Sequence, residues 1–214
     1  KGVLIMNLEK MLELTIAGRK DVAKSLELES LIKKYIAEEM ASKKGGNKEK
    51  NRLKAAEKYL KESVKTNIGR PQLHGSWMVD GKQYMSNGFS GIELVGDSIL
   101  EGLTELDKNI KPFNLVEAIN SSKEYAKIEQ QVDITALKAQ LVEAKAEAKA
   151  NKVKLIKVDK AFTKIGKAYY NVDLLLKTIT ILPGELTYYN SEELNPLLVL
   201  DDKGNSAIIL SVRR

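Results

Sequence analysis

Lysines at helical spacing are the residues of this sequence with the clearest chemical potential. Between residues 50 and 65, apolar residues recur every three or four positions, which predicts an amphipathic helix. One flank of that helix, about a quarter-turn from its apolar side, carries ammonium groups roughly one helical turn apart. They are Lys50, Lys54, Lys58, Lys61 and Lys65. Such a row can follow a phosphate backbone without reading base sequence, although an ordinary solvated face is the open alternative.

A second lysine row follows later in the chain, on a helix predicted over residues 135–151. Its flank lies roughly 60 to 120° from the apolar side, in the same sense as in the first helix. The row consists of Lys138, Lys145, Lys149 and Lys152. Glu143 and Glu147 neutralise part of this segment, and alanine-rich charged helices often carry lysine for solubility. Two matched rows favour contact with a phosphate backbone more than a single row would, and an ordinary solvated face stays the open alternative.

The sequence contains few of the residue types that commonly act in catalysis. The chain has one histidine, His74, and no cysteine, so disulfide frameworks, zinc fingers and cysteine–histidine nucleophile pairs are excluded. No glycine-rich phosphate loop is present. Asp201 and Asp202 fall in a predicted turn, and no other carboxylates form a recognisable metal spacing. We therefore expect no enzyme activity, no metal and no cofactor, and a hydrolase or nuclease is the weakest alternative.

Charge is unevenly distributed along the chain. The net charge is +6, and residues 1–70 alone hold 17 Lys and Arg against 10 Asp and Glu, a net of +7. This favours a polyanionic partner for the N-terminal third. No apolar run approaches the roughly 18 to 20 residues of a membrane span, so we expect a cytoplasmic protein without a membrane partner.

The predicted elements indicate an α+β fold. Residues 1–46 form an expected helical N-terminal segment, and residues 47–214 an expected second domain. In that domain a helix followed by three strands occurs twice, in half repeats 50–95 and 133–214 separated by a connector, 96–132. We expect short helices at 99–106 and 115–119, strands at 153–158 and 161–168, and a compact helix at 172–180. Two such units side by side would form one sheet with helices on its other face.

Short motifs in this domain resemble the bacterial β sliding clamps. The first is Arg70-Pro71-Gln72-Leu73-His74-Gly75, followed after a hairpin by Ser86-Asn87-Gly88-Phe89-Ser90-Gly91-Ile92-Glu93-Leu94. The tail is similar too, with Tyr170-Asn171-Val172-Asp173-Leu174-Leu175-Leu176, Asn195-Pro196-Leu197-Leu198 and Ile208-Ile209-Leu210-Ser211-Val212-Arg213. The family pattern departs at Asn87, where the clamps carry Asp, and at Phe89-Ser90, where they carry His-Arg.

The resemblance implies a DNA-clamp-like domain of a phage or prophage type. In such clamps several domains close into a ring, basic helices line the hole, and outer pockets take short peptides from replication proteins. The sequence pattern corresponds to a single clamp domain, so a ring would require a homo-oligomer. The resemblance therefore implies a non-enzymatic, non-sequence-specific DNA-binding accessory protein of the processivity type. The alternative is a protein-interaction module of the same fold without DNA binding, with the N-terminal helices as its working surface.

Overall fold

The computed structural model describes residues 32, 47–129 and 132–213. The chain divides into two compact units, residues 1–50 and residues 51–214, and the second is described here by itself. Apart from residue 32, the predicted N-terminal helical segment lies outside the described residues.

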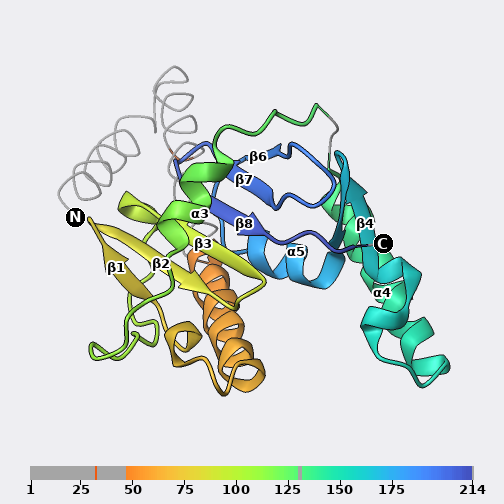
Figure 1. The fold of residues 1–214 in the computed structure, drawn as a ribbon, viewed down its shortest axis with the longest axis horizontal. Helices are drawn as coiled ribbons and strands as arrows, with labels where there is room; N and C mark the ends of the chain where they lie inside the picture. The colour runs from red at the N-terminus through yellow and green to blue at the C-terminus, as the bar shows by residue number, and fades with distance from the viewer. Residues whose placement is uncertain (1–31, 33–46, 130–131, 214) are drawn as a thin grey trace, which may run out of the picture. The chain divides into compact units, whose positions relative to one another are not determined.

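A six-stranded antiparallel sheet organises the second unit. Its strands are β1 (Trp77–Val79), β2 (Lys82–Ser86), β3 (Ser90–Leu94), β6 (Leu186–Tyr189), β7 (Leu197–Asp201) and β8 (Ser206–Ile209). They lie in the order β1-β2-β3-β8-β7-β6, so the two sets of three strands meet where β3 pairs with β8 (Figure 1). Each set is a run of hairpins, and the order is symmetric about the central pair. The predicted α+β class is confirmed, and both sets lie in one sheet.

Helices cover both faces of this sheet. A helix over residues 47–66 and α5 (Val172–Ile179) lie on one face, and α3 (Leu115–Ser122) lies on the other (Figure 1). Neighbouring side chains of β7 point to opposite faces of the sheet, which explains the three layers. Leu197 packs in the core beneath α5 and the helix over residues 47–66, and Leu198 packs in the core beneath α3. The expectation of helices on a single face was wrong, because the strands bury apolar residues on both of their faces.

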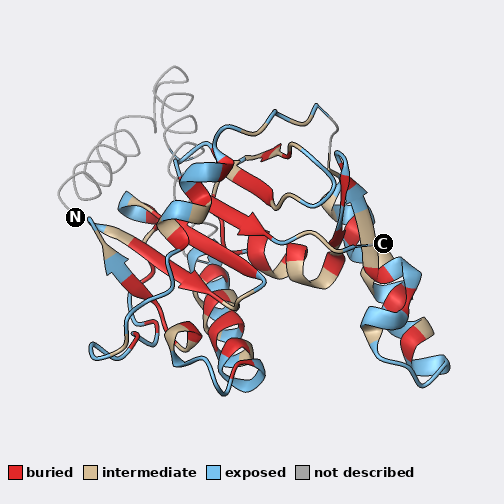
Figure 2. Ribbon diagram, viewed as in Figure 1, coloured by how far each residue is buried: buried red, intermediate tan, exposed pale blue. Residues whose placement is uncertain are grey.

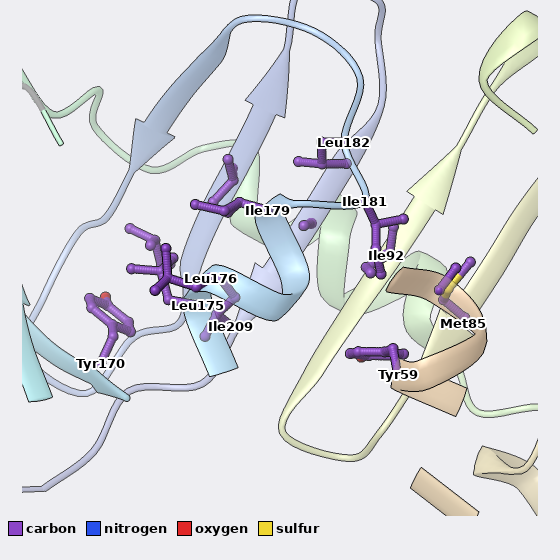
Figure 3. Packing of buried hydrophobic residues seen from close by; sticks show 14 of the residues in the cluster. Tyr59, Met85, Ile92, Tyr170, Leu175, Leu176, Ile179, Ile181, Leu182 and Ile209 are labelled. Atoms are coloured by element: carbon purple, nitrogen blue, oxygen red, sulfur yellow. The ribbon is translucent and has the colours of Figure 1, made fainter. Parts of the chain in front are cut away.

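The helix over residues 47–66 is fixed by a wholly buried side. Ala56, Tyr59 and Leu60 enter the same core as Ile92 of β3, part of which is drawn in Figure 3. The Tyr59 hydroxyl donates to the Ser90 carbonyl oxygen at 2.8 Å. The buried side of the helix is centred on Tyr59. Val64, which was predicted to lie in the core, is therefore 40% exposed.

Residues 96–171 depart most from the sequence prediction. Residues 99–106 are not helical. The predicted strand at 153–158 is replaced by a 3₁₀ turn, η3 (Leu155–Lys157), with a second turn, η4 (Asp159–Ala161), behind it. Only Leu155 and Val158 pack inward, and a spacing of three suits a helical turn rather than a strand. The predicted strand at 161–168 is a hairpin of β4 (Phe162–Ile165) and β5 (Ala168–Asn171).

The remaining helix, α4 (Ile134–Ala150), packs against η3, η4 and α5. Asp133 caps its N-terminus by accepting from the Thr135 and Ala136 amides. We call α4, η3, η4, β4 and β5 the α4 lobe, residues 134–171. Alanines and a valine form a small core within it, whereas Leu137, Ile165, Ala168 and Tyr170 join the main core, so buried and exposed residues alternate along the lobe (Figure 2). The α4 lobe therefore stands beside the six-stranded sheet, with α5 as its neighbour.

Candidate nucleic-acid interface

The first predicted lysine row is exposed along its whole length. The sheet buries one side of the helix over residues 47–66 and leaves the lysine side to solvent. The exposed members are Lys50, Lys54, Lys58, Lys61 and Lys65. Among the residues that the structure describes, none of these five forms an ion pair. Their ammonium groups are therefore available to an external anion.

A buried cation also ties the helix to η2 (Gly96–Ser98) and to the segment that follows α5. Arg52 is only 6% exposed. Its Nε donates to the Ile181 carbonyl oxygen and its Nη2 to the Ser98 carbonyl oxygen, each at 2.8 Å. Both acceptors lie in distant parts of the sequence. Arg52 thus serves the fold, whereas the lysines on the other side of the same helix serve no internal contact among the described residues.

A groove of about 240 Å³ lies where this helix, α4 and α5 meet. The helix over residues 47–66, which we call the first helix, contributes Ala55, Lys58 and Tyr59 to its lining. Leu141 comes from α4, and α5 with the residue that follows it contributes Asp173, Leu176, Lys177 and Thr180. Lys58 and α4 therefore border one groove. The first row contributes Lys58 to this lining, and the contribution of α4 is Leu141.

The second predicted row is exposed but partly engaged. Lys138, Lys145, Lys149 and Lys152 all reach solvent. Lys145 nevertheless pairs with Asp173 at 3.0 Å. Because Lys138 and Lys145 flank Leu141 at helical spacing, this side of α4 turns toward the groove. Lys152 differs, since α4 ends at Ala150 and Lys152 has a left-handed backbone, φ 54°.

A network of ion pairs lies at the groove. Asp173 accepts from Lys177 at 2.7 Å, and Lys177 reaches Glu62 of the first helix at 2.6 Å. Burial raises the pKa of Asp173, but hydrogen bonds from Lys177 and Lys145 outweigh it and lower that pKa overall. Burial lowers the pKa of Lys177, but its hydrogen bonds to Asp173 and Glu62 outweigh burial and raise that pKa overall. The pairing holds charges of both signs ionised and joins all three helices.

The sequence did not predict this network of ion pairs. The spacing of Asp173 and Lys177, four residues apart on a predicted helix, was the one available signal. Glu62 could not have been assigned, because its partner lies 115 residues away.

The residues considered for catalysis have structural partners. The His74 ring nitrogen Nε2 lies 2.7 Å from the Asn67 carbonyl oxygen. Asp201 is buried and accepts from the backbone amides of Gly184, Lys203 and Asn205. Within residues 47–129 and 132–213, no group of three acidic or histidine side chains is placed to hold a metal ion. Asp201 therefore organises the turn between β7 and β8.

Comparison with known proteins adds no further constraint on the site. No family model, curated protein or solved structure matches the chain. Within the described part of the chain, no helix has the length and apolar character needed to cross a membrane.

Proposed function

We propose that this protein is a non-enzymatic, clamp-like accessory factor that binds duplex DNA through its phosphates without reading sequence. The observation that carries the proposal is the row of five exposed lysines on the helix over residues 47–66, none ion-paired among the described residues. Lysine is a flexible point charge rather than a planar fork, so it suits backbone contact better than base recognition.

The length of the row suits an extended polyanion. From Lys50 to Lys65 the helix rises about 22 Å at roughly 1.5 Å per residue. Duplex DNA carries one negative charge for about every 1.7 Å of its axis, so the row could face several phosphates at once. The first row reaches the groove at Lys58, and α4, which carries the second row, reaches it at Leu141, which supports a surface wider than one helix.

The arrangement of the fold supports the clamp-like part of the proposal. A helix followed by three strands occurs at 47–94 and again from Val172 to Ile209, and the sheet order is symmetric about β3 and β8. In this proposal α5, rather than α4, is the counterpart of the first helix. A ring would require several copies of the chain, acting in the cytoplasm, and short peptides of replication proteins would bind outside the lysine surface.

The test is a charge-neutralising variant of the first row. In Lys54→Gln/Lys58→Gln/Lys61→Gln/Lys65→Gln, every changed side chain is exposed, so folding should be preserved. Binding to a fluorescent 24-base-pair duplex is measured by anisotropy from low to moderate salt. The slope of log affinity against log salt should weaken by about 0.9 for each lysine that contacts a phosphate.

A matched control removes the same number of charges elsewhere. Lys108, Lys111, Lys123 and Lys127 are four exposed lysines in the segment between β3 and α4. Their replacement by Gln should leave the slope nearly unchanged. Equal losses in the two variants would mean that net charge alone drives binding, and the proposed surface would be rejected.

A protein-interaction module without DNA binding is the second candidate, and one exposed apolar patch favours it. Phe89, Phe113 and Leu210 are 58%, 43% and 46% exposed around a shallow hollow of about 80 Å³. Exposed apolar groups that gather in this way often mark contact surfaces. Absence of duplex binding at low salt, together with self-association that Phe89→Ser abolishes in sedimentation, would establish this alternative.

A further inference from the structure

Residues 149–167 concentrate positive charge in one part of the α4 lobe. We call this segment the lysine strip; it holds seven lysines and a single acidic residue, Asp159, for a net charge of +6. The lysines are Lys149, Lys152, Lys154, Lys157, Lys160, Lys164 and Lys167, and all are exposed. The strip therefore carries as much net charge as the whole chain, in 19 residues.

The backbone that carries these lysines is held in place. Ala144 and Ala148 of α4 pack against Val158 and Ala161 of the strip in a small core. Gln140 adds two hydrogen bonds, donating through Nε2 to the carbonyl oxygens of Lys160 at 2.9 Å and Phe162 at 2.8 Å. The lysines consequently project from a fixed surface.

Little of this charge is balanced within the lobe. Lys160 pairs with Glu143 at 2.9 Å, and the Lys164 ammonium lies 5.9 Å from the centre of the Tyr169 ring. In the part of the chain that the structure describes, Lys154, Lys157 and Lys167 form no ion pair. Like charges gathered in this way repel one another, and a bound polyanion would relieve that repulsion.

The lysine strip continues the surface already proposed for DNA. Lys149 belongs both to the strip and to the row on α4, which borders the groove at Leu141. From Lys138 to Lys149 the helix rises about 16 Å, at roughly 1.5 Å per residue. Figure 1 shows α5 between the first helix and the α4 lobe. A ligand that follows this path must be extended, which a nucleic-acid backbone is and a single phosphate group is not.

We infer that Lys154, Lys157, Lys164 and Lys167 form a second phosphate-contacting surface for the same duplex, lengthening its footprint beyond the sheet. This inference rests on the proposed function, because the strip is taken to act together with the first helix. Sequence analysis assigned no binding role to these four lysines.

The test replaces these four lysines by Gln, alone and combined with the quadruple Gln variant of the first helix. Anisotropy is measured on 12- and 24-base-pair duplexes across a salt series, and thermal unfolding by circular dichroism checks folding. On the longer duplex the strip variant should bind on the order of tenfold more weakly and lose about 0.9 from the salt slope per contact. On the shorter duplex its loss should be smaller, because a short duplex offers fewer phosphates to the two surfaces at once.

The outcomes separate this inference from the function on which it rests. In one outcome the first-helix variant loses duplex affinity, and the strip variant binds like the control changed at Lys108, Lys111, Lys123 and Lys127. That outcome overturns the strip and leaves the proposed function standing. Loss in the strip variant alone overturns the first-helix interface and the shared footprint together. Equal losses on both duplex lengths also overturn the shared footprint.

One further arm tests for a different anionic surface. Vesicles of phosphatidylcholine containing phosphatidylserine are sedimented with the wild type and the strip variant. Vesicle binding that requires the strip lysines, without duplex binding at low salt, overturns both proposals in favour of a lipid surface.

Discussion

The helix over residues 47–66 and α4 carry lysines at similar spacing, yet the two helices are held in different ways. The first buries an aromatic and aliphatic side against the sheet and hydrogen-bonds through Tyr59. In α4 the buried positions are Leu137, which joins the main core, and Ala144 and Ala148, which form the small core of its own lobe. Lysine spacing alone therefore does not tell a helix anchored on a sheet from one that mainly supports its own lobe.

The electrostatic surroundings of the two rows differ as well. Lys54, Lys58, Lys61 and Lys65 form no ion pair among the described residues, whereas Lys145 of α4 is bound by Asp173. A cation that already has a partly buried carboxylate partner has less to gain from a phosphate. The comparison indicates that the first helix supplies the stronger contacts and that Asp173 limits those of α4.

The largest expected effect is on the free energy of unfolding, and it compares how firmly the two helices are anchored. Tyr59→Ala empties a buried site and removes the Tyr59 hydrogen bond to the Ser90 carbonyl oxygen, so it should lower the free energy of unfolding by about 3–5 kcal/mol. Leu141→Ala, at a partly buried position of α4, should cost about 1 kcal/mol. Urea denaturation followed by circular dichroism measures both. Similar costs would show that α4 is anchored as firmly as the first helix.

These anchors explain which parts of the fold could be predicted from the sequence. Local signals placed the hairpin at Asp80-Gly81, where both residues have positive φ, and the long helices with their apolar periodicity. They failed where packing decides the structure. The chain at 153–158 reads as a strand, but Leu155 and Val158 turn inward against α4 and impose a 3₁₀ turn. In the site, exposure of the lysines was predictable, whereas the bond from Lys177 to Glu62 required the tertiary fold.

Asp173 distinguishes the second lysine row from the first, and its replacement tests that difference. Asp173→Asn should cost about 1–2 kcal/mol of unfolding free energy, because charge-assisted hydrogen bonds from Lys145 and Lys177 are lost. The same change frees these two cations beside the groove. Duplex affinity should therefore rise several-fold, with a salt slope steeper by about one to two. A variant that is less stable and binds more weakly would refute the limiting role of Asp173.

The pH dependence of stability tests the same carboxylate in a different way. Since the pKa of Asp173 is lower in the folded protein, its ionised form stabilises the fold above the unfolded pKa of about 3.9. That contribution should be lost as the pH falls below about 4 and through the folded pKa. The stability difference between the wild type and Asp173→Asn should therefore narrow from pH 6 to pH 3 in urea titrations. A difference that stays constant over this range would contradict the ionised pairing.

The smallest expected effect compares one lysine from each row. Lys54→Gln removes an exposed cation that has no ion-pair partner among the described residues, so the salt slope of duplex binding should weaken by about 0.9. Lys145→Gln removes a cation whose charge Asp173 already balances, and the slope should change by much less. Lys108→Gln serves as the single-charge control. If Lys145→Gln and Lys54→Gln weaken the slope equally, the ion pair must open when DNA binds, and the two rows would then be equivalent contacts despite their different surroundings in the free protein.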